Sequence, residues 1–279
     1  MDIIGKKVRT IIVGDVHGCL QELNWLLEKC EFDPKRDRLI SLGDVVDRGP
    51  DSRGCVELFM RHEMVLGNHE ERAISYYEKW LKAGSPSDPD EIRRSLAFRN
   101  EYHERTFLSL EPRHFEWMKT LPKFIRLPPE DCANREVTLV HAGCLPDVPL
   151  EQQDDFMLMH IGNIMPRNIG GRNEHGHVEH GYWPPLVQTW WTSKAPKDSF
   201  YWASRYDGSL GLVVFGHTGV DKPEWFNYAL ALDTGCCFGR SLSALILPDW
   251  RLVSVPSSVS VPDRKRKRYE VHPGIFIHG

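Results

Sequence analysis

The chain has 279 residues, 41% of them hydrophobic, which is enough to bury one large core, and nothing in its composition indicates extensive disorder. Its formal net charge of -4 excludes a general electrostatic attraction to polyanions such as nucleic acid. Any phosphorylated substrate must therefore be bound by local positive charge, from metal ions or from an arginine cluster.

Short apolar runs, each bounded by glycine or aspartate, predict a series of buried strands along the chain. Between the first two runs, Leu20, Leu23 and Leu27 follow the spacing of one face of an amphipathic helix, so the chain begins with a strand, helix, strand unit. In chain order, the predicted strands are 9–13, 38–42, 63–66, 137–140, 210–215, 228–232, 242–247 and 251–255.

Further helices are predicted over 54–62, 70–83, 90–110 and 112–120, with a breaker stretch at 84–89. Segment 146–208 has little periodicity and is rich in Gly, Pro, His, Trp and Tyr, which predicts a loop-rich cap region, and 256–279 is interpreted as a C-terminal tail. No internal repeat or linker interrupts the pattern. The prediction is a single α/β domain over 1–279.

Polar side chains follow the predicted strands at the points where the strands end. Because ligands of α/β sheets bind outside the carboxyl ends of the strands, residues far apart in the chain can converge there. Asp15 and His17 are two positions apart and can point to the same side of an extended segment, while Asp44 offers two oxygens that suit a bridge between two ions. The other candidates that follow strands are Asp47, Arg48, Asn68, His69, His141 and His217.

Carboxylate, amide and imidazole groups without thiolate form a mixed oxygen and nitrogen ligand set. Such a set favours Mn, Fe, Zn or Co over a structural cysteine-zinc site or an all-oxygen calcium site. A metal can lower the pKa of bound water from about 15.7 to about 7, which makes hydroxide available near neutral pH. The sequence therefore predicts metal-assisted hydrolysis.

Five glycine-flanked motifs occur in one order along the chain, and together they resemble the calcineurin-like metallophosphatases of the phosphoprotein-phosphatase-like superfamily. The resemblance implies a central β-sandwich flanked by helices, with a dinuclear metal site at the carboxyl ends of the strands. The motifs are Gly14-Asp-Val-His-Gly18, Gly43-Asp-Val-Val-Asp-Arg-Gly49, Gly67-Asn-His-Glu70, His141-Ala-Gly143 and Gly216-His-Thr218.

The resemblance also implies roles for individual residues and two divalent ions as cofactors, with Mn as the first choice in vitro. His69 would be the general acid, oriented by Asp47, and a hydroxide bridging the ions would attack the phosphorus atom. Arg48 would clamp phosphate, and Arg205 is the candidate for a second clamp. The implied ligands are Asp15, His17 and Asp44 for the first ion, and Asp44, Asn68, His141 and His217 for the second.

Several features also have simpler interpretations, which stay open at this stage. Arg48 could brace the turn before a helix cap at Asp51 or Ser52, and the basic run 264–268 could be a solvated tail, a nuclear targeting signal or a polyanion contact. The cap histidines His175, His177 and His180 are interpreted as a solvated loop rather than a metal site. The aromatic residues of the cap either stack on nucleotide bases or pack onto the core. These residues are Trp183, Trp190, Trp191, Tyr201 and Trp202.

Two substrate classes compete within the resemblance. The segment Leu232–Ala244 resembles the symmetrical diadenosine tetraphosphatases of bacteria and their relatives, whereas Ser/Thr protein phosphatases usually have His-Gly-Gly in place of His141-Ala-Gly143. Glu70 and Arg240 depart from the tetraphosphatase pattern. The resemblance thus implies hydrolysis of a phosphoanhydride bond in a small dinucleoside polyphosphate such as diadenosine tetraphosphate. The alternatives are a Ser/Thr protein phosphatase acting on a phosphoprotein, an inorganic polyphosphatase, or an inactive metal-binding scaffold.

The cysteines and the N-terminus bear on the cellular compartment. Seven cysteines, an odd number without zinc-type or disulfide-type spacing, predict a reducing environment. The first residues lack a signal-peptide pattern, and no apolar run is long enough to span a bilayer. We therefore expect a cytoplasmic protein, with the nucleus as an alternative because of the run 264–268, and neither a membrane partner nor an obligatory nucleic-acid partner.

Overall fold

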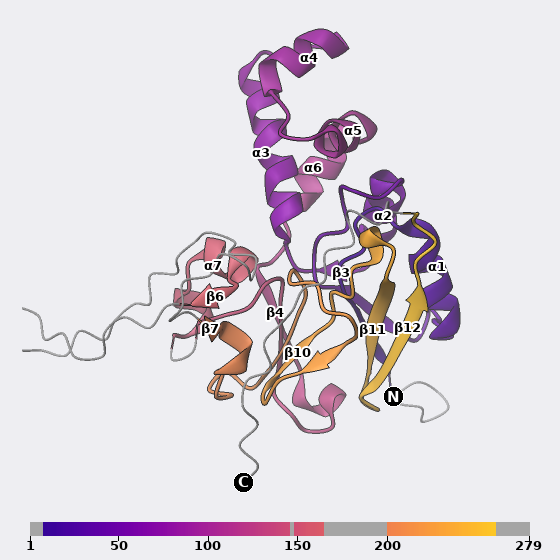
Figure 1. Ribbon diagram of the computed structural model, residues 1–279, viewed down its shortest axis with the longest axis vertical. Helices are drawn as coiled ribbons and strands as arrows, with labels where there is room; N and C mark the ends of the chain where they lie inside the picture. The colour runs from indigo at the N-terminus through magenta and orange to yellow at the C-terminus, as the bar shows by residue number, and fades with distance from the viewer. Residues whose placement is uncertain (1–7, 146–147, 165–199, 261–279) are drawn as a thin grey trace, which may run out of the picture.

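Two five-stranded sheets form the centre of the computed structural model, which describes residues 8–145, 148–164 and 200–260 (Figure 1). The first sheet contains β1 (Thr10–Val13), β2 (Arg38–Ser41), β3 (Glu63–Met64), β11 (Ser241–Leu247) and β12 (Arg251–Pro256). The second contains β4 (Phe124–Leu127), β5 (Val137–Val140), β8 (Leu212–Phe215), β9 (Glu224–Trp225) and β10 (Ala229–Ala231). Their orders are β12-β11-β1-β2-β3 and β4-β5-β8-β10-β9.

The alternation of side chains along each strand explains why the sheets pack face to face. In β1, Ile12 belongs to a buried cluster that also contains Leu139 of β5 and Val214 of β8, so it faces the second sheet. Ile11 and Val13 belong to a different buried cluster, shared with the helices on the outer face of the first sheet. The predicted β-sandwich flanked by helices is confirmed.

The strands that precede the candidate site residues run parallel to one another. In the first sheet β1 pairs in parallel with β2, and β2 with β3; in the second, β8 pairs in parallel with both β5 and β10. Parallel neighbours end at the same edge of a sheet. The loops that follow β1, β2 and β3 therefore lie together, as do those that follow β5, β8 and β10.

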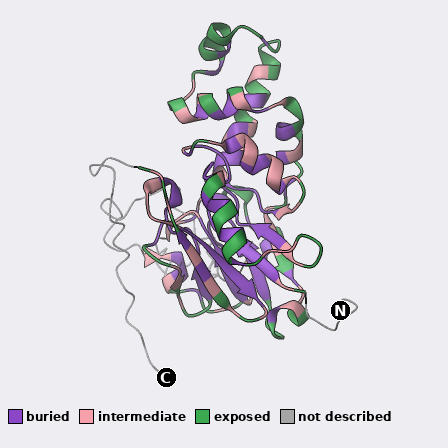
Figure 2. Cartoon of the chain, turned by 90° about the vertical axis from the view of Figure 1, so that its right-hand side faces the viewer, coloured by how far each residue is buried: buried purple, intermediate pink, exposed green. Residues whose placement is uncertain are grey.

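Helices cover the outer faces of the sandwich and extend beyond it. On the first sheet lie α1 (Leu20–Lys29) and α2 (Ser52–Phe59). A group of four helices, here called the helical arm, projects from the sandwich in Figure 1. Figure 2 shows that its outer turns are largely exposed, whereas the strands are buried. The arm consists of α3 (Asn68–Lys82), α4 (Pro89–Leu96), α5 (Glu101–Ser109) and α6 (Pro112–Met118).

The predicted single helix over 90–110 is wrong, because the chain breaks between α4 and α5. Ala97 caps α4 in the left-handed conformation, with φ of 46°, and the chain then turns before α5 begins at Glu101. The strand β4 was not predicted, since Arg126 interrupts its apolar run. Edge strands tolerate such residues because one of their sides is open to solvent.

The predicted cap region contains regular structure where the chain is described. It includes α7 (Asp155–His160) and a two-stranded sheet of β6 (Asn163–Ile164) and β7 (Phe200–Tyr201). The Asp154 side chain accepts a hydrogen bond from the backbone N–H of Phe156 and so caps α7. The helix packs with Trp202 in a buried cluster on the outer face of the second sheet. The described part of the predicted cap region therefore contains a helix and two strands as well as loops.

All seven cysteines lie in the described residues, where they are buried and free of disulfide bonds. Within the same ranges, no helix combines the length and the apolar character that crossing a membrane requires.

Candidate metal centre

The six predicted metal ligands meet at one edge of the sandwich. Asp15 and His17 follow β1, Asp44 follows β2, and Asn68 is the first residue of α3, just beyond β3. His141 directly follows β5, and His217 lies two residues beyond the end of β8. The parallel strands place these loops side by side, as the sequence predicts.

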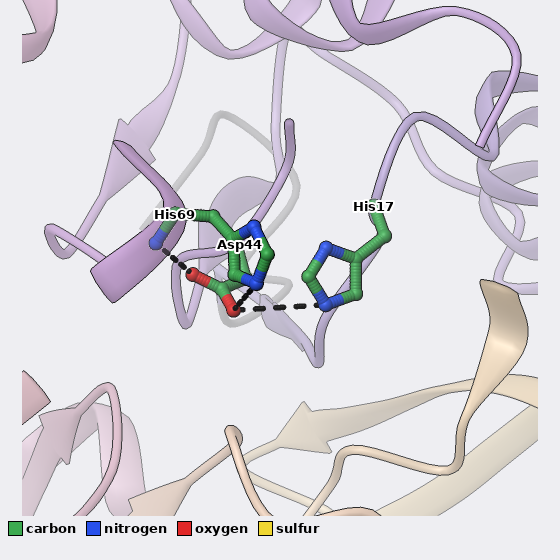
Figure 3. Close-up of side chains that lie close together, drawn as sticks. All are labelled: His17, Asp44 and His69. Carbon is green, nitrogen blue, oxygen red and sulfur yellow. Dashed lines mark hydrogen bonds and ion pairs between the residues drawn. The ribbon is translucent and has the colours of Figure 1, made fainter. Parts of the chain in front are cut away.

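A first group of donors gathers around one oxygen of Asp44. The Nε2 atom of His17 lies 3.6 Å from Oδ2 of Asp44 and 3.9 Å from Oδ2 of Asp15. Figure 3 shows dashed lines from one carboxylate oxygen of Asp44 to the imidazole rings of both His17 and His69. The Nδ1 atom of His17 is 2.9 Å from the carbonyl oxygen of Val46, to which it donates. This bond fixes the tautomer and leaves the Nε2 lone pair facing the carboxylates.

A second group gathers around the other oxygen of Asp44. Its Oδ1 atom lies 3.4 Å from Nε2 of His141. The side-chain oxygen of Asn68 is 2.9 Å from the same nitrogen and 3.0 Å from Nδ1 of His217. His141 donates from Nδ1 to the carbonyl oxygen of Leu42 at 2.8 Å, so its Nε2 atom is again the one that faces the site. Asp44 thus belongs to both groups and offers one oxygen to each.

The loops that carry these groups adopt unusual backbone conformations. His17, Asp44 and His217 all have positive φ, of 46°, 54° and 65°, in the left-handed region that residues other than glycine rarely adopt. Such conformations persist only when the surrounding structure enforces them, and they cluster at functional sites. Gly67 enables one close approach, because a Cβ atom there would lie 2.4 Å from the backbone N and the Oδ1 atom of Asp44.

The carboxylate of Glu70 holds the loop after β2 in place. Fully buried, it accepts hydrogen bonds from the backbone N–H groups of Asp44 and Val45, each at 2.8 Å, of Val46 at 3.1 Å and of Gly67 at 3.2 Å. Burial raises the pKa of Glu70 to about 7, and the nearby negative charge of Asp44 adds to the effect. Glu70 departs from the tetraphosphatase pattern, yet it directly supports the loop that bears the shared carboxylate.

His69, Asp47 and Arg48 form a second layer beside the metal-facing groups. The Nδ1 atom of His69 donates to Oδ2 of Asp47 at 2.6 Å, which leaves Nε2 pointing toward the site. Arg48 donates from Nη2 to that Nε2 atom at 3.0 Å, and from Nη1 to Nε2 of His17 at 2.6 Å. Its guanidinium also lies over the ring of Phe238, 5.1 Å from the centroid. Arg48 thus reaches into the site instead of bracing its own turn.

The electrostatics of the cluster suit cations. Burial and the neighbouring Asp233 raise the pKa of Asp15 well above its usual range. Burial would lower the pKa of His141, but Asp44 and Asp15 outweigh it and raise this pKa to about 10. Both shifts come from negative charge gathered out of contact with water. Two overlapping groups of oxygen and nitrogen donors in such a field fit a pair of divalent cations.

Two other predicted positions have contacts of a different kind. Arg205 is exposed, and its guanidinium lies over the ring of Phe200, 4.0 Å from the centroid. Trp202 is completely buried and donates from Nε1 to the carbonyl oxygen of Ala142 at 3.1 Å, so it packs in the core and cannot stack on a base. Tyr201 of β7 is half-buried, with its ring centroid 5.5 Å from that of Phe226, so it packs within the protein. The other cap aromatics, the three cap histidines and the run 264–268 lie outside the described residues.

Two residues near the site were missed by the reasoning from sequence. Asp233 follows β10 as Asp44 follows β2, and it is buried beside Asp15. Its position after an apolar run was a signal that could have found it. His103 lies on α5, and its Nε2 atom is 3.5 Å from Oδ2 of Asp47. No strand end or motif marks His103, so the sequence gives no comparable signal.

Comparison with known proteins agrees with this geometry. The family model of the calcineurin-like phosphoesterases matches residues 8–221. The symmetrical bis(5'-nucleosyl)-tetraphosphatase of Methylobacillus flagellatus is 27% identical, with 88% of this chain and 95% of that protein covered. The asymmetrical bis(5'-nucleosyl)-tetraphosphatase PrpE of Bacillus thuringiensis is 30% identical over 91% of this chain and 97% of the relative. A crystal structure provisionally described as a diadenosine tetraphosphatase superposes with a TM-score of 0.66 at 26% identity, covering 91% of this chain and 95% of that one.

The fold and the cluster of side chains that could bind metal are those of a metallophosphoesterase. The chain belongs to the calcineurin-like phosphoesterase family, and it is a hydrolase that acts on phosphoester or phosphoanhydride bonds. This finding, with every predicted ligand present, disfavours the inactive scaffold.

Proposed function

We propose that Asp15, His17 and Asp44 hold one divalent ion and that Asp44, Asn68, His141 and His217 hold a second, with manganese as the first choice and Co, Fe or Zn as alternatives. The observation that carries this proposal is the position of Asp44, whose two oxygens face two separate groups of donors at 3.6 and 3.4 Å. When bound, such ions polarise phosphoryl oxygens and make a water molecule acidic enough to attack near neutral pH.

The neighbouring side chains supply the rest of the chemistry. His69 is the general acid: Asp47 accepts from its Nδ1–H, and Nε2, which accepts from Arg48 in the absence of substrate, would have to carry a second proton to give one to the leaving oxygen. Arg48 binds the phosphoryl group, for which a guanidinium has the matching fork of N–H donors. Arg205 remains a candidate for a second phosphate contact, and its exposed position over Phe200 gives that role little support.

We propose a dinucleoside polyphosphate such as diadenosine tetraphosphate as the substrate. Support comes from relatives named as tetraphosphatases over almost the whole chain, both symmetrical and asymmetrical. The two kinds differ in the bond that is cut: cleavage of the central phosphoanhydride gives two nucleoside diphosphates, and cleavage of an outer one gives a triphosphate and a monophosphate. The resemblance of Leu232–Ala244 to the symmetrical enzymes favours the central bond.

The test is a parallel assay of the manganese-loaded protein on diadenosine tetraphosphate, a phosphopeptide and inorganic polyphosphate, with products separated by chromatography. We expect the highest kcat/KM for the dinucleotide and ADP as its product. ATP with AMP would move the cut to an outer bond. A preference for the phosphopeptide or for polyphosphate by orders of magnitude would overturn the substrate proposal.

A reducing compartment such as the cytoplasm completes the proposal. The seven buried, unpaired cysteines support it. To test this, cells are lysed in acid to trap the thiols, and the protein is then unfolded and its thiols are titrated. All seven thiols should be found, and a stable disulfide would contradict the proposed compartment.

A further inference from the structure

His103 brings a second imidazole to the carboxylate that orients His69. It lies on α5 with 4% of its surface exposed. Its Nε2 atom is 3.5 Å from Oδ2 of Asp47, the same oxygen that accepts the hydrogen bond from Nδ1 of His69 at 2.6 Å. The ring centroids of His103 and His69 are 6.1 Å apart. The Asp47 carboxylate therefore lies between an imidazole from α3 and one from α5.

The polar atoms of His103 lack partners of their own. Among the residues that the structure describes, neither ring nitrogen has a hydrogen-bond partner, although both are buried. Buried polar groups are almost always paired, because leaving one unpaired is unfavourable. The 3.5 Å separation from Asp47 is only a few tenths of an ångström beyond a normal N–H to O bond. Hydrogen bonds in catalytic sites are often long in the free enzyme and shorten when substrate binds.

The contacts of α5 fix where this ring lies. Arg105, two residues further on, donates from Nη2 to the carbonyl oxygens of Arg48 at 2.8 Å and Gly49 at 2.9 Å. The hydroxyl groups of Thr106 and Ser52 are hydrogen-bonded at 3.1 Å, and Ser52 Oγ also accepts from the backbone N–H of Asp47 at 2.9 Å. The helix is thus attached to the same loop that carries Asp47, independently of His103.

The surroundings keep the imidazole neutral. Burial lowers the pKa of His103 to about 4; His69, Arg72 and Arg99 act in the same direction, and Asp47 opposes them. A neutral ring with its proton on Nε2 is a hydrogen-bond donor that adds no charge beside Arg48 and His69. His103 is therefore suited to orient Asp47 and unsuited to transfer a proton itself.

We propose that His103 is a positioning residue, which donates from Nε2 to Asp47 and thereby holds that carboxylate against Nδ1 of His69. The proposal rests on the proposed role of His69 as general acid. It assigns the helical arm a part in the reaction: the arm supplies the outer member of a His103, Asp47, His69 chain.

The experiment uses the metal-loaded full chain and a series of aryl phosphates whose leaving groups span a range of pKa. Protonation of the leaving oxygen matters more as that pKa rises, so loss of general-acid function shows as a steeper dependence of kcat on leaving group. The variants are His103→Leu, which removes the donor, and His103→Gln, whose amide nitrogen can replace Nε2. His114→Leu is the matched control, because His114 is a fully buried imidazole of the same arm whose contacts are with Glu111 and Glu57.

We expect His103→Leu to lower kcat about tenfold on the poorest leaving groups and little on the best, with KM and metal content unchanged. His103→Gln should restore kcat to within about threefold of the parent, and His114→Leu should leave the leaving-group dependence unchanged. If His103→Leu does not fold, His103→Asn, whose shorter amide cannot reach the Nε2 position, replaces it.

Three outcomes distinguish a failure of the role proposed for His103 from a failure of the proposed function. If His69→Ala steepens the leaving-group dependence and the His103 variants do not, the role of His103 is wrong while the proposed function stands. If His103→Gln is as impaired as His103→Leu, shape and not the donor is what matters, and the inference fails. If His69→Ala itself leaves the dependence unchanged, the general-acid assignment fails, and the inference fails with it.

Discussion

The metal-facing edge of the sandwich and the helical arm are built on opposite principles. At the edge, carboxylates and imidazoles, most of them buried, lie on loops with left-handed backbone at His17, Asp44 and His217. In the arm, apolar rings provide the order: Tyr77 and Phe115 stack with centroids 4.6 Å apart and planes 4° apart. The edge holds reactive groups on strained backbone, which lowers stability, whereas the packing of aromatic rings in the arm raises it. Substitutions should therefore impair chemistry at the edge, including the start of α3 and His103, and stability among the packed rings of the arm.

Asp44→Asn tests the edge most severely. The neutral amide can offer only one oxygen, so it cannot serve both groups of donors, and we expect turnover to fall by more than the 10²- to 10⁴-fold typical of a lost general acid. Metal content, measured by mass spectrometry after dialysis, should fall as well. Asp37→Asn is the control, because Asp37 pairs with Arg9 away from the site. Full metal content in Asp44→Asn would refute the shared carboxylate.

His69→Ala should have the next largest effect. Loss of the general acid lowers kcat on diadenosine tetraphosphate by about 10²- to 10⁴-fold. His69 lies close to the shared carboxylate, with Nε2 3.9 Å from Oδ2 of Asp44, but both ions should stay bound because all six proposed ligands are intact. The measurement is kcat together with metal stoichiometry. Metal loss equal to that of Asp44→Asn would show that the two residues do not have the different roles assigned to them.

The two candidate clamp arginines should differ in effect. Arg48→Ala removes a guanidinium that is hydrogen-bonded to His17 and His69. Because a hydrogen bond from a charged group to the phosphoryl oxygens would be lost, we expect kcat/KM to fall about 10- to 100-fold. Arg205→Ala removes an exposed guanidinium over Phe200, so kcat/KM should change by less than about threefold. Steady-state kinetics of both variants decide the matter. A larger loss from Arg205→Ala would restore its predicted role as second clamp.

The smallest effect on chemistry is expected among the packed aromatic rings of the arm. Phe115→Ala removes a buried ring from its stack with Tyr77 and should lower the free energy of unfolding by about 3–5 kcal/mol. In protein that remains folded, kcat should match the parent. Urea denaturation and steady-state kinetics give the two quantities. A loss of kcat without a loss of stability would break the distinction between edge and arm.

The same distinction explains which features of the fold and the site could be predicted from the sequence alone. Asp15, Asp44 and His141 could be found because apolar strands end beside them, and parallel strands bring their ends together. His103 could not, since only the packing of α5 onto the loop after β2 brings it to Asp47. The sequence pattern also did not predict the end of α4 at Ala97. A helix that ends in the left-handed conformation usually has glycine at that position, and here the residue is alanine.

The seating of two ions around Asp44 is the claim on which the rest depends. Anomalous diffraction from crystals of the manganese-loaded protein tests it directly. We expect two peaks, one beside Asp15 and His17 and one beside Asn68, His141 and His217, with Asp44 between them. A single peak, or peaks at a different cluster such as Asp47, His69 and His103, would contradict it.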